Sequence, residues 1–194
     1  MNSLSAMILT GGSSTRFGSD KSQAKLGAHS LLENLLITLP GEIDIVIVGP
    51  ELENSARHVR YTQEHPFGGG PVAAIEAGLK LIDSEFVAII ATDMPFASQV
   101  VAILSENFSE TEDAIIPLDT EGIGQPLCAM YRRDALARAI QELGNTQGQS
   151  MRNLVKILTI KELRLDPALA RILLDVDTPS DLERAISLGK ESEK

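Results

Sequence analysis

Thirteen residues near the amino terminus, Leu9 to Lys21, could bind a phosphate group. Their sequence is LTGGSSTRFGSDK, and it follows an apolar run directly. Two adjacent glycines let the backbone approach a bound group closely, and Arg16 and Lys21 supply positive charge to neutralise it. Neither standard phosphate-binding motif fits: the glycines do not follow G-x-G-x-x-G, and Asp20 rather than glycine precedes Lys21. The alternative is a plain turn between a strand and a helix, with solvated charges.

A second candidate for chemistry is the acidic turn Asp93-Met94-Pro95, which follows an apolar run at residues 86–91. A carboxylate at the exit of a buried strand can hold Mg²⁺ against phosphate oxygens. The alternative is that Asp93 caps the helix expected to begin near Ser98.

Three more segments carry polar residues beside turn signals. They are GGGPVAAIEAGL at 68–79, Gln125-Pro126-Leu127, and DVDTPSDL at 175–182. Each also has a purely structural interpretation, as a helix opening at Pro71, an edge-strand proline, and a helix start capped by Thr178.

Taken together, these segments resemble the MobA-like nucleotidyltransferases, the family of the molybdenum cofactor guanylyltransferase. The resemblance runs in the family's order over nearly the whole chain, from Leu9 to Leu182. It is most specific in the first loop, whose matching positions are Leu9, Gly11, Gly12, Ser14, Arg16, Gly18 and Lys21. The resemblance implies a Rossmann-like fold and the transfer of a nucleotidyl group from a nucleoside triphosphate to a phosphate or carrier group.

Roles for individual residues are implied by the same resemblance. Lys21, Arg16 and Asp93 are the expected catalytic residues, and Asp93 and Asp177 the expected ligands of Mg²⁺. Gln125 and Asp175 are expected to contact the acceptor. Family members often carry an aspartate shortly before the glycine-proline segment, and here Glu64 or His65 stands nearest; we take Glu64. The expected nucleotide-binding residues are Leu9, Thr10, Gly11, Gly12, Lys21, Glu64 and Asp93.

The reaction implied is transfer of GMP from GTP to molybdopterin cofactor, with Mg²⁺ bound and pyrophosphate released. Guanylyltransferases of the family often carry asparagine where this chain has Asp175 and Asp177, so a cytidylyltransferase acting on the same cofactor stays open. A nucleotidyltransferase for another small phosphate acceptor and a non-catalytic nucleotide-binding regulator also stay open.

Composition narrows the class of protein. The chain has 194 residues, enough for one well-cored domain, which we expect over 1–188 with a disordered tail over 189–194. A net charge of −10 argues against nucleic acid as a partner. We expect no signal peptide and no membrane span, because the apolar runs are short, and the single Cys128 excludes an internal disulfide. These features favour a cytoplasmic protein. The resemblance also implies contacts with proteins that make the cofactor or accept it.

Short apolar runs alternate with helical patterns along the chain. We expect strands at 5–10, 43–48, 58–62, 86–91, 114–117, 126–131 and 172–176. Helices are expected at 30–39, from 71, at 98–108, 133–143 and 151–158, and from 178. This order predicts a three-layer α/β fold with a mostly parallel central sheet. Ligands of such folds bind beyond the carboxyl ends of the strands, where the loops after Thr10 and Thr92 lie.

Overall fold

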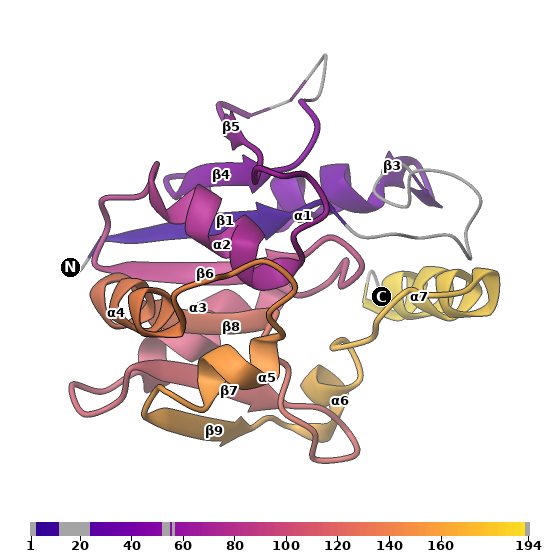
Figure 1. The fold of residues 1–194 in the computed structure, drawn as a ribbon. Coiled ribbons are helices and arrows are strands. Elements are labelled where there is room, and N and C mark those ends of the chain that lie inside the picture. The colour runs from indigo at the N-terminus through magenta and orange to yellow at the C-terminus, as the bar shows by residue number, and fades with distance from the viewer. Residues whose placement is uncertain (1–2, 12–23, 52–54, 56, 193–194) are drawn as a thin grey trace.

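A seven-stranded sheet forms the centre of the protein (Figure 1). The computed structural model describes residues 3–11, 24–51, 55 and 57–192. From one edge to the other the strands are β5 (Arg60–Thr62), β4 (Asp44–Val48), β1 (Leu4–Leu9), β6 (Phe86–Ala91), β8 (Cys128–Arg132), β7 (Ala114–Leu118) and β9 (Ile160–Arg164). Within this sheet β8 alone runs antiparallel to its neighbours, so the predicted mostly parallel sheet is confirmed.

The central strands are apolar on both faces because helices cover both sides of the sheet. In β1, Ala6, Met7 and Ile8 are fully buried. Successive side chains of a strand point to opposite faces, so Ile8 joins one apolar cluster and Met7 the other. Such continuous apolar runs are typical of strands in the middle of a parallel sheet.

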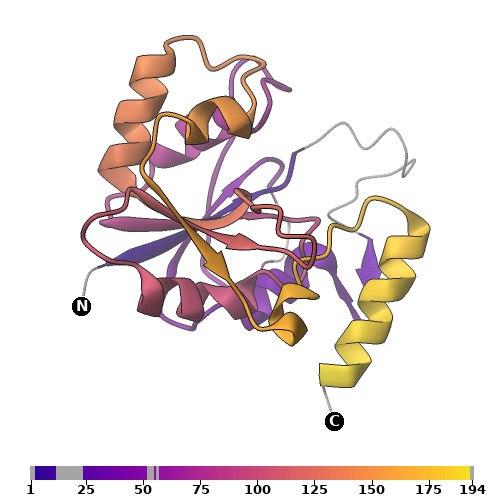
Figure 2. The same cartoon turned by 90° about the horizontal axis from the view of Figure 1, so that it is seen from below.

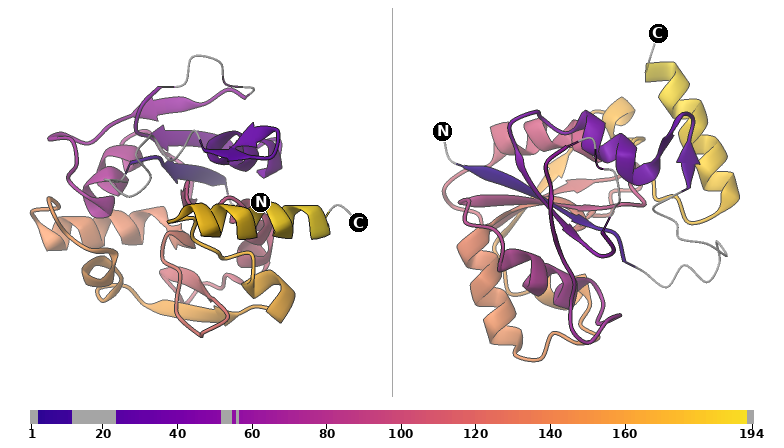
Figure 3. Two further views of the ribbon diagram at one scale, coloured as in Figure 1. Left: turned by 90° about the vertical axis from the view of Figure 1, so that its right-hand side faces the viewer. Right: turned by 90° about the horizontal axis from the view of Figure 1, so that it is seen from above.

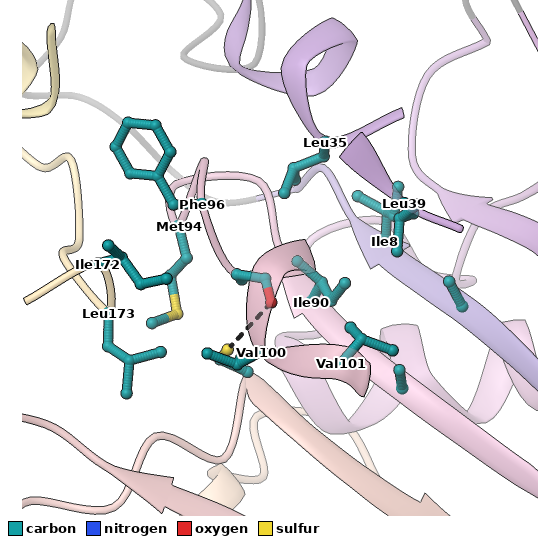
Figure 4. Packing of buried hydrophobic residues seen from close by; sticks show 14 of the residues in the cluster. Ile8, Leu35, Leu39, Ile90, Met94, Phe96, Val100, Val101, Ile172 and Leu173 are labelled. Atoms are coloured by element: carbon teal, nitrogen blue, oxygen red, sulfur yellow. Dashed lines mark hydrogen bonds between the residues drawn. The ribbon is translucent and has the colours of Figure 1, made fainter. Parts of the chain in front are cut away.

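Helices on the first face are α1 (Leu31–Thr38) and α3 (Ser98–Asn107), with α6 (Pro167–Ala170) and α7 (Pro179–Ser192) beyond them. The second face carries α2 (Pro71–Leu79), α4 (Arg133–Leu143) and α5 (Met151–Val155). Figure 2 shows the resulting three layers, and Figure 4 shows Ile8 and Ile90 of the sheet in one cluster with Leu35 of α1 and Val100 of α3.

A short hairpin of β2 (Lys25–Leu26) and β3 (His29–Ser30) leads into α1. Ser30 caps the helix as predicted: its hydroxyl accepts from Glu33 N at 3.1 Å, and the Glu33 carboxylate accepts from Ser30 N at 2.6 Å. The two views of Figure 3 show α7 beside this hairpin, with which it is in contact.

Several expected elements differ from the structure. The strand predicted at 172–176 is wrong: these residues form a turn and irregular chain, and Ile172, Leu173 and Val176 are apolar because they pack into the first-face cluster. The predicted helix at 151–158 ends at Val155, and helix α7 continues through Ser192, where a disordered tail was expected. Strand β9 was missed because its half-exposed sequence IKELR lacks an apolar run.

No helix in the part of the chain that the structure describes is both long and apolar enough to cross a membrane.

Candidate active site

The carboxyl ends of three neighbouring strands are tied together by backbone and threonine hydrogen bonds. Thr10, directly after β1, donates from its N and its Oγ1 to the carbonyl oxygen of Val48 in β4, at 3.0 and 3.1 Å. Thr92, directly after β6, donates from its N and its Oγ1 to the carbonyl oxygen of Leu9, at 3.1 and 2.6 Å. These bonds fix where the loops that follow β1 and β6 begin.

The structure describes the loop after β1 as far as Gly11. Leu9 is buried, and its carbonyl oxygen already accepts a hydrogen bond from Thr92 Oγ1. Leu9 therefore fixes where the loop begins, and its carbonyl oxygen is not available to a ligand. Gly11 is exposed, and a Cβ added to it would meet no atom of the described part of the chain within 4 Å. Its backbone is therefore accessible to a ligand. The predicted residues Gly12, Arg16 and Lys21 lie outside the described residues.

Gly49, at the end of β4, makes the close approach of β4 and the first loop possible. Its φ is +144°, and a Cβ added there would lie 1.9 Å from Oγ1 of Thr10. Gly49 N also donates to the carbonyl oxygen of Thr62 at 2.9 Å, which joins β5 to the same edge. Only glycine fits this position without displacing Thr10.

Two segments far apart in the sequence meet after β6. Val176 N donates to the backbone oxygen of Asp93 at 2.8 Å, so Asp177 follows directly beside the Asp93 turn. Asp181 fixes this segment, because its Oδ2 accepts from Thr178 Oγ1 at 2.7 Å and Thr178 N at 2.9 Å. The bonds from Thr178 hold the pKa of Asp181 below its usual value. No pattern in the sequence signals the pairing of Val176 with Asp93.

The donor set at this turn fits a magnesium ion. Mg²⁺ prefers oxygen ligands, keeps several waters, and is typically held by one or two carboxylates together with phosphate oxygens. Asp93 is half-buried and Asp177 is exposed, so both carboxylates are at the surface of the turn. The described residues contain no group of three or more His, Cys, Asp or Glu that could form a complete protein cage. Asp93 and Asp177 could therefore hold a metal ion only together with oxygens from a substrate or water.

The predicted acceptor residues reach the same edge of the sheet. Leu127 accepts through its carbonyl oxygen from Ala91 N at 2.8 Å, so the segment that begins with Gln125 adjoins the end of β6. Asp175 is close enough to Cys128, the first residue of β8, to raise the pKa of its thiol, an effect second to that of burial. The backbones of Asp93, Val176 and Leu127 therefore meet beyond the end of β6.

Glu64 lies apart from this group. Its Oε1 accepts from Gly68 N at 3.0 Å, which folds the loop between β5 and α2. The loop borders a hollow of about 330 Å³ that is also lined by His65, Glu76, Lys80 and Gln147. Gly69 packs tightly against the Gln147 side chain beside this hollow, because a Cβ added to Gly69 would lie 2.5 Å from Oε1 of Gln147. Glu64 thus belongs to the loop before α2 rather than to the Asp93 turn.

A larger hollow of about 500 Å³ lies on the opposite side of the sheet's strand ends, where the parallel strands begin. Arg132, Arg133 and Arg138 line it together with Asp83, Glu85 and Asp134. Arg132 and Arg133 are committed to the fold there: they donate to the carbonyl oxygens of Glu112 and Ile82 and pair with neighbouring carboxylates. The volume of a hollow alone therefore does not identify the active site.

A three-layer α/β fold with a mostly parallel sheet, in which the chain leaves β1 and β6 at the carboxyl ends of neighbouring strands, is the architecture of Rossmann-like nucleotide-binding proteins. The chain belongs to the family of the MobA-like NTP transferase domain, whose model matches residues 6–166. It is therefore a nucleotidyltransferase, which sets aside the non-catalytic regulator considered from the sequence. Asp175 and Asp177 lie beyond the matched range.

Curated relatives extend over most of the chain. A probable molybdenum cofactor guanylyltransferase from Carboxydothermus hydrogenoformans is 28% identical over 97% of this chain and 98% of its own length. Another from Peptoclostridium acidaminophilum is 34% identical, covering 79% of this chain and 73% of that protein.

Solved structures show the same fold. The molybdopterin-guanine dinucleotide biosynthesis protein A of Archaeoglobus fulgidus has a TM-score of 0.73 at 24% identity, covering 96% of this chain and 99% of that one. The 2-C-methyl-D-erythritol 4-phosphate cytidylyltransferase of Thermus thermophilus has a TM-score of 0.71 at 14% identity, covering 98% and 100%. At these identities the likeness concerns the fold alone, so it does not choose between guanine and cytosine.

Proposed function

We propose that this nucleotidyltransferase transfers GMP from GTP to molybdopterin cofactor, with Mg²⁺ bound and pyrophosphate released. The names of its curated relatives support the substrates. The hydrogen bond from Val176 N to the backbone oxygen of Asp93, which brings the residue before Asp177 against the Asp93 turn, is the observation that supports a shared metal site. The same proposal includes a cytoplasmic setting and contacts with proteins that make or use the cofactor.

In this proposal the protein binds and orients two phosphate-bearing substrates. The backbone of Leu9, Thr10, Gly11 and Gly12 cradles the triphosphate, Arg16 and Lys21 neutralise it, and Glu64 binds elsewhere on the nucleotide. Asp93 and Asp177 hold Mg²⁺, which when bound supplies positive charge and a template for the phosphate oxygens. Gln125 and Asp175 orient the acceptor.

The chemical step needs no nucleophile from the protein. A phosphate oxygen of the acceptor attacks the α-phosphorus of GTP in line, a new phosphorus–oxygen bond forms, and the bond to the β-phosphate oxygen breaks. The leaving pyrophosphate takes the electron pair of the broken bond on its oxygen. The protein contributes by holding the two oxygens in line and by stabilising charge as it moves, which together account for most of catalysis in phosphoryl-group chemistry.

Pyrophosphate release is the direct test. The purified protein is assayed with GTP, Mg²⁺ and molybdopterin cofactor, and then with each of the three omitted in turn. We expect turnover only in the complete mixture. Asp93→Asn should abolish it, whereas Asp113→Asn, a change at the opposite edge of the sheet, should not. Absence of turnover with any nucleoside triphosphate would contradict the proposal.

A cytidylyltransferase is the second candidate, favoured by the aspartates at 175 and 177. The same assay with CTP in place of GTP decides between them. Thermal shifts with each nucleotide and Mg²⁺ give an independent comparison, because a ligand stabilises a protein according to how far its concentration exceeds its Kd. A larger shift and faster turnover with CTP would overturn the guanine assignment.

A further inference from the structure

The turn that carries Asp93 is buried except at Asp93 itself. From 91 to 98 every other residue is buried, and Asp93 is half-buried. Met94 and Phe96 pack into the first-face cluster, where Figure 4 shows them together with Ile172. The turn thus presents one side chain toward the surface. The position of that carboxylate depends on how the backbone on either side of it is held.

Two consecutive backbone turns make up this segment. The first closes where Met94 N donates to the carbonyl oxygen of Ala91 at 3.1 Å, and the second where Ala97 N donates to the carbonyl oxygen of Met94 at 3.0 Å. Thr92 anchors the first turn to β1 through its two hydrogen bonds to the carbonyl oxygen of Leu9. The second turn sets the direction in which the chain leaves the first, so it needs an anchor as well.

Helix α1 provides the anchor for the second turn. Nδ2 of Asn34 donates to the carbonyl oxygen of Pro95 at 2.7 Å. Pro95 is buried, and no other donor among the described residues bonds to this oxygen. A buried carbonyl oxygen without a donor is unfavourable, so removal of the Asn34 amide favours other arrangements of the turn. Because Pro95 lies two residues after Asp93, these arrangements move the backbone next to the carboxylate.

A second polar contact lies one helical turn further along α1. Oγ1 of Thr38 is 2.5 Å from Oγ of Ser98, the first residue of α3. Asn34 and Thr38 are four residues apart and therefore lie on the same face of α1. The first contact holds the turn after Asp93, whereas the second joins one helix to another. The two contacts thus share a setting and differ in what they hold.

We propose that Asn34 is a positioning residue for Asp93: its amide holds the chain after Asp93 in the arrangement from which the carboxylate binds a divalent cation. Asn34 acts through the carbonyl oxygen of Pro95 and is not itself a metal ligand. This inference rests on the proposed function, in which Asp93 holds Mg²⁺. When the turn leaves this arrangement part of the time, the apparent affinity for the cation falls with the fraction of molecules that keep it.

Two substitutions by apolar residues of similar size separate positioning from helix packing. Asn34→Leu removes the donor to Pro95. Thr38→Val is the matched control, because it removes the hydroxyl that contacts Ser98 and leaves the Asn34 bond in place. Each substitution leaves one polar group without its partner, so both should lower the Tm by similar amounts. Asn34→Ala, with the same expected result, takes the place of the leucine variant if that variant does not fold.

Calorimetry measures the effect on the cation without turnover. The Kd of the α,β-methylene analogue of GTP, or of CTP if that binds more tightly, is determined once with Mg²⁺ and once with EDTA. We expect Mg²⁺ to tighten binding to the wild type. In Asn34→Leu this gain should shrink about five- to tenfold, the effect of one hydrogen bond, while the Kd in EDTA stays within about twofold. Thr38→Val should behave as the wild type does.

Three results of the calorimetry would overturn the inference. The first is an equal gain from Mg²⁺ in the wild type and in Asn34→Leu, including no gain in either. The second is a Kd that rises equally with Mg²⁺ and with EDTA, since this would indicate a general loosening of the site. The third is the same loss of gain in Thr38→Val, which would assign the effect to helix packing.

Kinetics in the pyrophosphate assay separate this inference from the proposed function. The Mg²⁺ concentration that gives half the maximal rate should rise about five- to tenfold in Asn34→Leu, and the kcat at saturating Mg²⁺ should stay within about threefold. A fall in kcat that excess Mg²⁺ does not restore would overturn the inference and leave the proposed function intact. If the wild type turns over no nucleoside triphosphate, the proposed function fails, and the calorimetry decides the inference by itself.

Discussion

Replacing Gly49 by alanine tests whether the close approach of β4 and the first loop is as tight as the structure requires. The added Cβ would lie 1.9 Å from Oγ1 of Thr10, against ordinary contacts beyond 3.4 Å, and φ is +144°. Thr10 Oγ1 must move and lose its 3.1 Å bond to Val48 O, which costs about 1 kcal/mol. The unfavourable φ adds about 1–2 kcal/mol.

We therefore expect Gly49→Ala to lower the free energy of unfolding by about 2–3 kcal/mol, or the Tm by about 5–10 °C for a chain of this size. Urea unfolding followed by circular dichroism measures it. Gly41→Ala is the matched control, because a Cβ there meets nothing within 4 Å and no unfavourable φ is involved. That control should be neutral or slightly stabilising.

A double-mutant cycle identifies the contact responsible. Thr10→Ala removes Oγ1 and leaves only the Thr10 Cβ, 3.2 Å from the added group. In the Thr10→Ala background Gly49→Ala should therefore cost about 1 kcal/mol less than in the wild type. Equal costs in the two backgrounds, or a Gly49→Ala variant as stable as Gly41→Ala, would refute the steric reasoning.

The remaining predictions concern the metal pair, the cap of α1 and the buried thiol. Asp93→Asn should lower kcat at least about 100-fold in the pyrophosphate assay, because it removes a carboxylate proposed to hold Mg²⁺; a far-ultraviolet circular dichroism spectrum that differs from that of the wild type would point to misfolding instead. Ser30→Ala should lower the free energy of unfolding by about 1 kcal/mol, because it removes the cap of α1. The hydrogen bonds from Ser30 hold the pKa of Glu33 below its usual value. The ionised Glu33 carboxylate therefore stabilises the fold at pH values above the usual pKa, and this stabilisation is lost as the pH falls through the lowered pKa. Glu33→Gln should flatten the acid limb of a curve of stability against pH, and an unchanged limb would contradict this. Burial raises the pKa of the Cys128 thiol, so a thiol reagent at mildly alkaline pH should label Cys128 only after denaturant is added.

Much of the sheet could be predicted from the sequence because its central strands are bounded by turn signals and buried on both faces. Phe86–Ala91 and the helix Arg133–Leu143 match the expected bounds. The segment 172–176 shows where this reasoning fails. A buried apolar run predicts a strand equally well when it only anchors an irregular segment to the core, and the sequence contains nothing that distinguishes the two cases.

The candidate site divides along similar lines. The family pattern names Asp93, Asp177 and Gln125, and strand order explains why they share one edge. The hydrogen bond from Gln125 Nε2 to the Asp119 carboxylate, at 2.7 Å, could not be predicted from the sequence. Acidic residues are common in loops, and a spacing of six residues does not reveal how two side chains are oriented. Contacts that join distant segments are visible only in three dimensions.

The hydrogen bond between Val176 and Asp93 also determines when, during synthesis of the chain, the two segments can meet. A ribosome produces the chain from its amino end, so Asp93, in the turn after β6, emerges 84 residues before Asp177, the difference between the two positions. A nascent chain that has already built β1, β4 and β6 still lacks the second carboxylate. The two carboxylates proposed to hold the metal can therefore come together only after every strand of the sheet has been made.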